Sequence, residues 1–184
     1  MAQNPNVRVI SLSDAPGSKE SWSKPTIVIL LWMLVEYFFV TNPIQFSSRI
    51  RRLALKSFGA KIGVGVILRP RLRVKFPWNL EIGDNSWIGE GVWIHNQDKV
   101  TIGNDVCISQ ESFITTGSHA FREDMGLLTK PINIEAGVWV CSRAVITMGS
   151  QIGRSAVIPA LALVKGHVQA NTVYGISDRK SKRF

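Results

Sequence analysis

The sequence predicts an all-β fold: a parallel β-helix of hexapeptide repeats, with an N-terminal helical segment and an excursion loop after His119. Three observations predict it. Ile, Leu or Val recurs at every sixth residue along most of the chain, a small residue usually follows four places later, and glycine often follows the aliphatic residue directly. A period of six fits neither an α-helix nor strands of freely varying length, but it is the spacing of hexapeptide solenoids.

The aliphatic residues of this repeat are expected to fill the interior of a triangular coil. Each hexapeptide supplies one short strand and one turn, and three of them make a coil of about 18 residues. The series consists of Ile62, Leu68, Val74, Ile82, Ile88, Ile94, Ile102, Ile108, Ile114, Ile134, Val140, Ile146, Ile152, Ile158 and Val164. Because no single coil can bury its own apolar face, the coils are expected to stack.

Length, charge and cysteine content are those of one basic domain. The chain has 184 residues, enough to bury a sizeable core, and a formal net charge of +9. Basic residues gather at 49–52, 69–75 and 179–183, as solvated surface or as attractors of a polyphosphate or an anionic membrane face. Cys107 and Cys141 lie among apolar neighbours without metal-ligand spacing, which is typical of reduced, buried thiols in a cytoplasmic protein.

Composition divides the chain into four segments. Residues 1–24 are polar and are expected to form a flexible arm. Residues 25–59 form an apolar and amphipathic helical segment, in which 47–58 have the pattern of an amphipathic helix. The β-helix is expected over 60–176, and 177–184 form a basic tail.

The apolar run at 26–40 allows two interpretations. Its 15 residues, which include Glu36, are short of the roughly 20 that cross a bilayer. It also lacks the basic start and cleavage site of a signal peptide. It is expected either to cap the open end of the solenoid, or to lie against the inner membrane face with help from Arg49, Arg51 and Arg52. The protein is therefore expected in the cytoplasm, with peripheral membrane contact under the second interpretation.

The repeat is interrupted directly after His119, at its only long excursion. A loop that leaves a stiff solenoid is a suitable place for a binding site. The chain has three histidines, and small or hydroxyl-bearing residues precede this one. His119 is thus a candidate functional residue, against the ordinary alternative of a surface histidine at a corner.

Several motifs resemble the hexapeptide-repeat acetyltransferases, and within them the branch of colanic acid biosynthesis acetyltransferases. They are Cys-Ile-Ser-Gln and Thr-Gly-Ser-His within 107–119, and Pro-Ile-x-Ile and Val-Trp-Val within 131–140. The similarity takes in 58–63 and 80–83 and covers roughly residues 25–170. It implies a left-handed β-helix, an exception to the usual crossover rule, assembled as a homotrimer with its sites between neighbouring chains. It also implies acetyl-CoA as donor, and a sugar hydroxyl of an exopolysaccharide or capsule precursor, free or lipid-linked, as acceptor.

In this resemblance His119 matches the family's catalytic base. A sugar hydroxyl is a poor nucleophile, and a positioned imidazole that takes its proton is typically worth ~10²–10⁴-fold in rate. A backbone N–H near Ser142, which matches a small residue of the family, is the candidate donor to the thioester oxygen. The sequence shows no recognisable Ser–His–Asp or Cys–His pattern. The acceptor hydroxyl is therefore expected to attack the thioester directly, without a covalent enzyme intermediate.

The chain departs from the family directly after this histidine. Branch members often have His-Asp-Tyr where this chain has His119-Ala120-Phe121. The acid that would orient the imidazole is therefore absent from its usual place. Glu123, Asp124 or a main-chain carbonyl are the candidates to replace it.

The cofactor-binding residues implied by the resemblance are Ser142, Arg143, Ala160 and Lys165. The glycines of the family's C-terminal pattern are replaced around Ala160, although Ala160 itself matches, and the following lysine is displaced by one place to Lys165. Arg143 and Lys165 are expected to meet the phosphates of CoA by charge attraction, with a solvated face as the alternative.

Asn96 and Trp139 are the candidates for substrate binding. Asn96 lies in an irregular turn one coil before His119, and its alternative role is that of an ordinary turn residue. Trp139 is expected to pack at a corner or to flank the substrate cleft. Trp87 and Trp93 stand six residues apart, and are expected to pack at a trimer contact or under the N-terminal helix.

Two other kinds of protein share this solenoid pattern. A zinc enzyme would need converging histidines, two of them close together, whereas His95, His119 and His167 are widely spaced. No metal and no nucleic-acid partner are expected. A catalytically silent scaffold of a polysaccharide-assembly complex is the alternative to an enzyme, and acetyl-CoA turnover discriminates between them.

Overall fold

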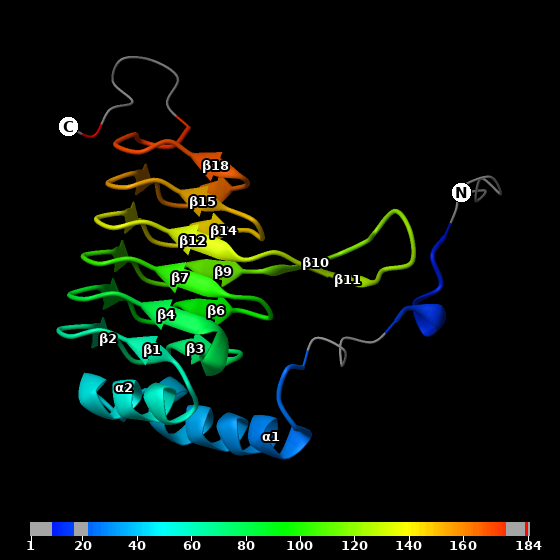
Figure 1. The fold of residues 1–184 in the computed structure, drawn as a ribbon, viewed down its shortest axis with the longest axis horizontal. Helices are drawn as coiled ribbons and strands as arrows, with labels where there is room; N and C mark the ends of the chain where they lie inside the picture. Colours follow the sequence, from blue (N-terminus) through cyan, green and yellow to red (C-terminus); the bar gives the residue numbers. More distant parts are fainter. Residues whose placement is uncertain (1–8, 17–21, 176–182, 184) are drawn as a thin grey trace.

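The computed structural model describes residues 9–16, 22–175 and 183 of the chain, which form a three-sided solenoid standing on N-terminal helices (Figure 1). A short 3-10 turn, η1 (Leu12–Asp14), precedes them. The expected flexible arm lies partly, and the basic tail almost wholly, outside the described residues.

Three helical elements form one end of the molecule (Figure 1). Helix α1 (Thr26–Val35) runs directly into a π-helical stretch, η3 (Glu36–Thr41), and α2 (Ser48–Ser57) follows. Ser47 caps α2, since its hydroxyl accepts a hydrogen bond from the N–H of Ile50 at 3.5 Å. Within the described residues, no helix has the length and apolar character that crossing a bilayer requires.

The solenoid walls are three parallel sheets, visited in the order A, B, C by successive strands. Sheet A contains β1 (Lys61–Ile62), β4 (Leu80–Ile82), β7 (Val100–Ile102), β12 (Ile132–Ile134), β15 (Gln151–Ile152) and β18 (His167–Val168). Sheet B contains β2 (Ile67–Leu68), β5 (Trp87–Ile88), β8 (Cys107–Ile108), β13 (Trp139–Val140) and β16 (Val157–Ile158). Sheet C contains β3 (Arg73–Val74), β6 (Trp93–His95), β9 (Phe113–Thr115), β14 (Val145–Ile146) and β17 (Leu163–Val164). A short turn, η4 (Pro77–Asn79), precedes β4. The predicted parallel β-helix of hexapeptide repeats is confirmed.

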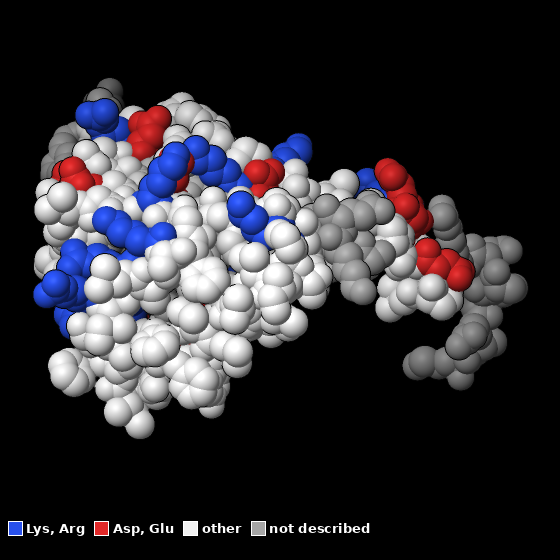
Figure 2. Space-filling view, turned by 60° about the horizontal axis from the view of Figure 1, so that its bottom comes forward, with Lys and Arg blue, Asp and Glu red and all other residues white. Residues whose placement is uncertain are grey.

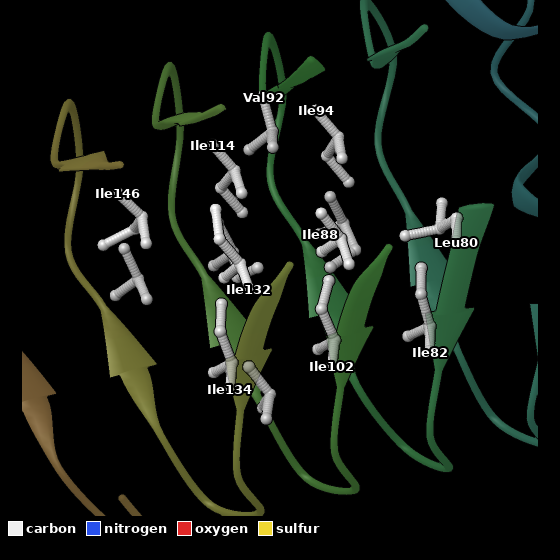
Figure 3. Close-up of a cluster of buried hydrophobic side chains, with 14 of the residues drawn as sticks. Leu80, Ile82, Ile88, Val92, Ile94, Ile102, Ile114, Ile132, Ile134 and Ile146 are labelled. Carbon is white, nitrogen blue, oxygen red and sulfur yellow. The ribbon is translucent and has the colours of Figure 1, made fainter. Parts of the chain in front are cut away.

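The six-residue aliphatic series forms the core. Every member is buried, and members of successive coils stack directly on one another, as Ile82, Ile102 and Ile134 do through the paired strands β4, β7 and β12 (Figure 3). Burying one such side chain contributes about 1.5–3 kcal/mol. The repetition of this contact from coil to coil makes the solenoid a stiff support.

The helices close the lower end of the solenoid. Trp32 and Leu55 belong to the same buried core as the repeat. The indole N–H of Trp32 donates to the carbonyl of Val74 at 2.9 Å, and the Glu36 carboxylate accepts from the N–H of Val74 at 2.6 Å. The first coil therefore has its free strand edge, at β3, bonded to helical side chains instead of water.

Arg51 corrects one expectation. It is fully buried, with its guanidinium donating to the carbonyls of Val40 and Gln45, so it closes the end of η3 and faces no membrane. Burial lowers the pKa of Arg51. Arg49 and Arg52, by contrast, keep part of their surface in solvent.

The excursion after β9 is a hairpin arm. Strand β10 (Gly117–His119) pairs antiparallel with β11 (Leu127–Thr129), placing His119 opposite Leu127. The arm projects away from the coils before the chain returns to sheet A at β12 (Figure 1).

Candidate active site

His119 ends strand β10 on the arm, with its side chain exposed. Its Nδ1 atom lies 2.8 Å from the main-chain carbonyl oxygen of Met125. A carbonyl can only accept a hydrogen bond, so Nδ1 carries the proton and the lone pair of Nε2 is free. This is the form in which a neutral imidazole can accept a proton from a substrate.

The main-chain carbonyl of Met125 is the hydrogen-bond partner that the structure shows for the His119 imidazole. Met125 has a positive φ of 63° and its N–H donates to the carbonyl of Ala120 at 3.1 Å. Asp124 does not contact the imidazole but accepts from the N–H of Gly126 at 2.8 Å. The tight turn of the arm thus presents a carbonyl to His119.

A shallow cavity of about 280 Å³ lies beside the imidazole. It is lined by His119, Ala120, Phe121, Arg122, Glu123 and Leu128. All six belong to the arm, so within one chain no residue of the coils lines this cavity together with His119.

Ser142, Arg143 and Ala160 lie together at the corner between sheets B and C. They line a groove of about 410 Å³ whose other lining residues are Gln110, Glu111 and Leu161. Three successive coils each contribute the same two turn positions to this groove. The second residue of each pair (Glu111, Arg143, Leu161) has a positive φ of 58–63°.

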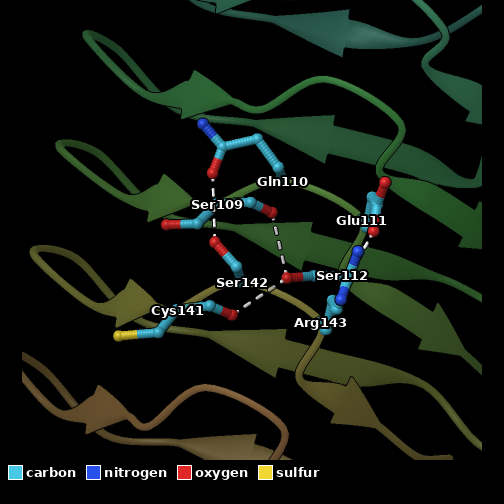
Figure 4. A network of polar contacts seen from close by, with 7 residues as sticks. All are labelled: Ser109, Gln110, Glu111, Ser112, Cys141, Ser142 and Arg143. Carbon is cyan, nitrogen blue, oxygen red and sulfur yellow. Dashed lines mark hydrogen bonds and ion pairs between the residues drawn. The ribbon is translucent and has the colours of Figure 1, made fainter.

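Polar contacts tie this groove together (Figure 4). The Ser142 hydroxyl donates to the Gln110 side-chain oxygen at 3.0 Å, and the Arg143 guanidinium pairs with Glu111 at 2.6 Å. In the part of the chain that the structure describes, the backbone N–H of Ser142 has no hydrogen-bond acceptor. That N–H is therefore free to donate to a ligand.

Lys165 and His119 lie at another corner of the triangle. The groove follows sheet B, whereas the arm and Lys165 both follow sheet C, after β9 and β17 respectively. The structure thus brings Ser142, Arg143 and Ala160 together, but places neither His119 nor Lys165 among them in one chain.

Asn96 is not available to an acceptor. It is fully buried; its side-chain oxygen accepts from the N–H of Phe76 at 3.0 Å, and its amide donates to the Phe76 carbonyl at 2.7 Å. Both of its polar groups are engaged within the coil, so the alternative role of Asn96 as a structural turn residue fits the geometry.

Trp139 points outward from sheet B. Its side chain is exposed, and its indole N–H donates to the Ser109 hydroxyl at 3.0 Å. It stacks above Cys107, which stacks above Trp87 in the same outward column. The two cysteines are free and only partly buried, which corrects the expectation of buried thiols. Burial, reinforced by Cys107 nearby, raises the pKa of the Cys141 thiol.

A further cavity, of about 450 Å³, separates α1 from sheet C. Trp93 lines it together with Ile29 and Met33, so this tryptophan lies under the N-terminal helix. Glu36 also lines the cavity, and burial raises the pKa of its carboxyl to about 7. Burial, with Lys75 and Arg73 nearby, lowers the pKa of His95 in the same wall.

Gln110 and Glu111 were not singled out from the sequence, although the repeat contained the signal. Gln110 follows its core isoleucine by two places, as Ser142 and Ala160 follow theirs. Aligning the three hexapeptides on the core residue would have placed all three at one corner. In residues 9–16, 22–175 and 183, no group of three or more His, Cys, Asp or Glu side chains could hold a metal ion.

The chain is similar to several acetyltransferases. It is 34% identical over 147 residues to WcaF of Escherichia coli K12, named for colanic acid biosynthesis as an acetyltransferase, with 79% of this chain and 80% of WcaF covered. The chain belongs to the hexapeptide-repeat acetyltransferases. No family model matches it. The galactoside O-acetyltransferase of E. coli K12 is 29% identical over 127 residues, covering 67% of this acetyltransferase and 63% of that enzyme.

Solved structures agree with the fold of this acetyltransferase. A hexapeptide-repeat acetyltransferase from Vibrio cholerae, complexed with acetyl-CoA, superposes with a TM-score of 0.72 at 23% identity, covering 79% of this chain and 80% of the other. A galactoside acetyltransferase in complex with coenzyme A gives a TM-score of 0.63 at 23% identity, with 79% and 74% covered. The expected left-handed β-helix is confirmed.

Proposed function

We propose that this acetyltransferase moves an acetyl group from acetyl-CoA to a sugar hydroxyl in exopolysaccharide or capsule biosynthesis, with His119 as general base. The observation that supports the proposal is the 2.8 Å contact between Nδ1 of His119 and the Met125 carbonyl. It holds the imidazole in the tautomer whose Nε2 can take a proton from a hydroxyl.

The reaction needs no covalent enzyme intermediate. The acceptor hydroxyl gives its proton to Nε2 of His119 while its oxygen attacks the thioester carbonyl. The resulting oxyanion accepts a hydrogen bond from the backbone N–H of Ser142, an interaction worth roughly 3 kcal/mol in comparable sites. Collapse breaks the carbon–sulfur bond, and the departing thiolate of CoA takes the proton from the imidazolium.

The groove at the corner of sheets B and C is the proposed site for the donor. Ser142 and Ala160 are small enough to let the pantetheine arm approach the backbone, and Arg143 supplies a positive charge for the phosphates. The complexes of the Vibrio cholerae protein with acetyl-CoA and of the galactoside enzyme with coenzyme A support this donor. Lys165, at the other corner, is proposed to reach the CoA of a neighbouring copy.

A homotrimer would complete the site. His119 and the donor groove lie at different corners of one chain, so the arm of one copy must approach the groove of the next. Trp139, exposed on sheet B three residues before Ser142, would then flank the acceptor between two copies. The acceptor class, a sugar or lipid-linked saccharide, is supported by the similarity to WcaF. We propose that the reaction takes place in the cytoplasm.

Release of free CoA tests the proposal. The full chain is incubated with acetyl-CoA and a panel of sugars, and the rate of thiol release is compared among the wild type, His119→Ala and His167→Ala. His119→Ala should lower kcat by ~10²–10⁴-fold with acetyl-CoA affinity unchanged. His167, an exposed histidine on the last strand of sheet A, is the matched control and should change nothing. Full turnover in His119→Ala would show that His119 is not the general base. No turnover in any of the three proteins would favour a catalytically silent scaffold.

A further inference from the structure

The outer face of the helical base is apolar. While α1 and α2 bury Trp32 and Leu55 against the solenoid, their other side leaves large side chains in solvent. We call this surface the apolar base; it consists of Leu31, Leu34, Phe38, Phe46, Ile50 and Leu53, each with 42–89% of its surface exposed. In Figure 2 the helical end of the molecule carries a broad white area without Lys, Arg, Asp or Glu side chains. Soluble proteins rarely leave an apolar patch of this kind without a partner.

The charge of the whole chain gathers around the same end. Residues 22–79 contain ten Lys or Arg and one acidic residue, Glu36, so they account for the entire formal net charge of +9. Arg49 and Lys56 project into solvent from α2, beside the apolar base. In Figure 2, basic side chains border the white area while acidic ones lie farther away. Glu36 does not offset them at this surface, because it begins η3 and its carboxylate accepts the Val74 N–H on the side facing the solenoid.

We propose that the apolar base docks on an anionic lipid bilayer, with α1, η3 and α2 lying flat in the headgroup region. No described helix is long enough to span the bilayer, which is consistent with helices that lie in the interface. Anionic headgroups supply the charge that complements Arg49 and Lys56. If the apolar bases of two copies faced each other instead, the same positive charges would be brought together. This inference goes beyond acetyl transfer and does not depend on it.

Binding to vesicles tests the docking. The full chain is mixed with vesicles of phosphatidylcholine alone, or with vesicles of equal parts phosphatidylcholine and phosphatidylglycerol, and the bound fraction is measured by flotation. Wild-type protein should float with the anionic vesicles and more weakly, or not at all, with the neutral ones. Added salt should weaken the binding, because it screens the basic border.

Matched variants separate the apolar and basic contributions. Leu34→Gln should weaken partitioning by about tenfold or more, because a leucine that enters the acyl boundary is worth roughly that factor. Leu163→Gln, which removes an exposed leucine from sheet C, should have no effect. Arg49→Gln should weaken binding by about fivefold, the typical contribution of one basic residue near an anionic surface. Arg154→Gln, an exposed arginine on the upper coils, should have none.

Light scattering decides whether a second copy covers the base instead. If docking is correct, the mass in solution is the same for wild type and Leu34→Gln, and circular dichroism shows both folded. The proposal is overturned if wild type ignores anionic vesicles, or if the paired variants lose binding equally. It is also overturned if Leu34→Gln lowers the mass of a wild-type oligomer that does not bind lipid.

Discussion

The imidazole of His119 and the main-chain carbonyl of Met125 are joined across the turn of the arm, Nδ1 to O, at 2.8 Å. The usual partner of a catalytic histidine is a carboxylate, whose charge also stabilises the imidazolium. A carbonyl fixes the tautomer through its dipole alone. The orientation of the His119 imidazole then depends on the backbone conformation of Met125, whose φ is 63°, as much as on any side chain.

Replacing Met125 should therefore affect catalysis through the backbone. Met125→Pro forces φ to about −65° and removes the N–H that bonds to Ala120, so the carbonyl should leave Nδ1. We expect a large fall in kcat, with the melting temperature of the solenoid unchanged because the arm contributes none of the buried core. Met125→Gly is the control: glycine accepts positive φ and keeps the carbonyl, so most activity should remain. Equal activity in both variants would argue against the contact.

The pair Arg143–Glu111 gives opposite predictions for donor affinity. The two side chains meet at 2.6 Å but are more than half exposed, so the ion pair contributes at most ~1 kcal/mol to stability. Arg143→Gln should raise KM for acetyl-CoA several-fold by removing a phosphate partner. Glu111→Gln frees the guanidinium of Arg143 and should lower the KM for acetyl-CoA. Steady-state kinetics at low and high salt would measure both, and parallel changes in the two variants would contradict a role for Arg143 in phosphate binding.

The solenoid could be predicted from the sequence because its rule is local. One aliphatic residue in six must enter the core, and each of them does, from Ile62 to Val164. The corner groove follows from the same register, which is why Ser142 and Ala160 meet there. Gln110 could have been added by the same alignment.

The rest depends on contacts that leave no pattern in the residue types. A backbone carbonyl has no sequence signature, so the partner of His119 could only be given as Glu123, Asp124 or an unspecified main-chain carbonyl. From the sequence, Asn96 is a turn residue near the expected acceptor site. Its burial depends on the neighbouring coil, where its side chain makes hydrogen bonds to the backbone of Phe76. Arg51 belongs to a basic run, yet it is the member that turns inward to the carbonyl of Val40.

Asn96 should matter for stability and not for the acceptor. Asn96→Ala leaves the N–H and carbonyl of Phe76 without their partner inside the coil, which should lower the free energy of unfolding by about 2 kcal/mol or more. KM for the sugar should stay the same at a temperature where the variant is folded. Asn104→Ala, in an exposed turn, is the control and should cost less than about 1 kcal/mol. Denaturant unfolding measures the stability, and steady-state kinetics measure the KM for the sugar. A raised KM for the sugar with unchanged stability would instead support a role for Asn96 in acceptor binding.

Glu36 should make stability depend on pH in a definite direction. Burial raises the pKa of its carboxyl from 4.5 to about 7, against the lowering effects of the Val74 hydrogen bond and of Arg73 and Lys75. Protonated Glu36 is thus favoured by folding, so its contribution is fully present below pH 4.5 and is lost as the pH rises through about 7. The loss is at most about 3–4 kcal/mol, from 1.36 kcal/mol per pKa unit over a rise from 4.5 to about 7.

Glu36→Gln isolates this effect, since glutamine can still accept the Val74 N–H but cannot ionise. The variant should match wild type at pH 4 and exceed it in free energy of unfolding at pH 8, as measured by denaturant titration. Subtracting the two proteins cancels the contribution of His95, which titrates in the same cavity and whose pKa is lowered. Glu90→Gln, which removes an exposed carboxylate, is the control and should not change how the free energy of unfolding depends on pH. Parallel pH profiles for wild type and Glu36→Gln would mean that Glu36 is ionised at no cost, and that the cavity under α1 is wet.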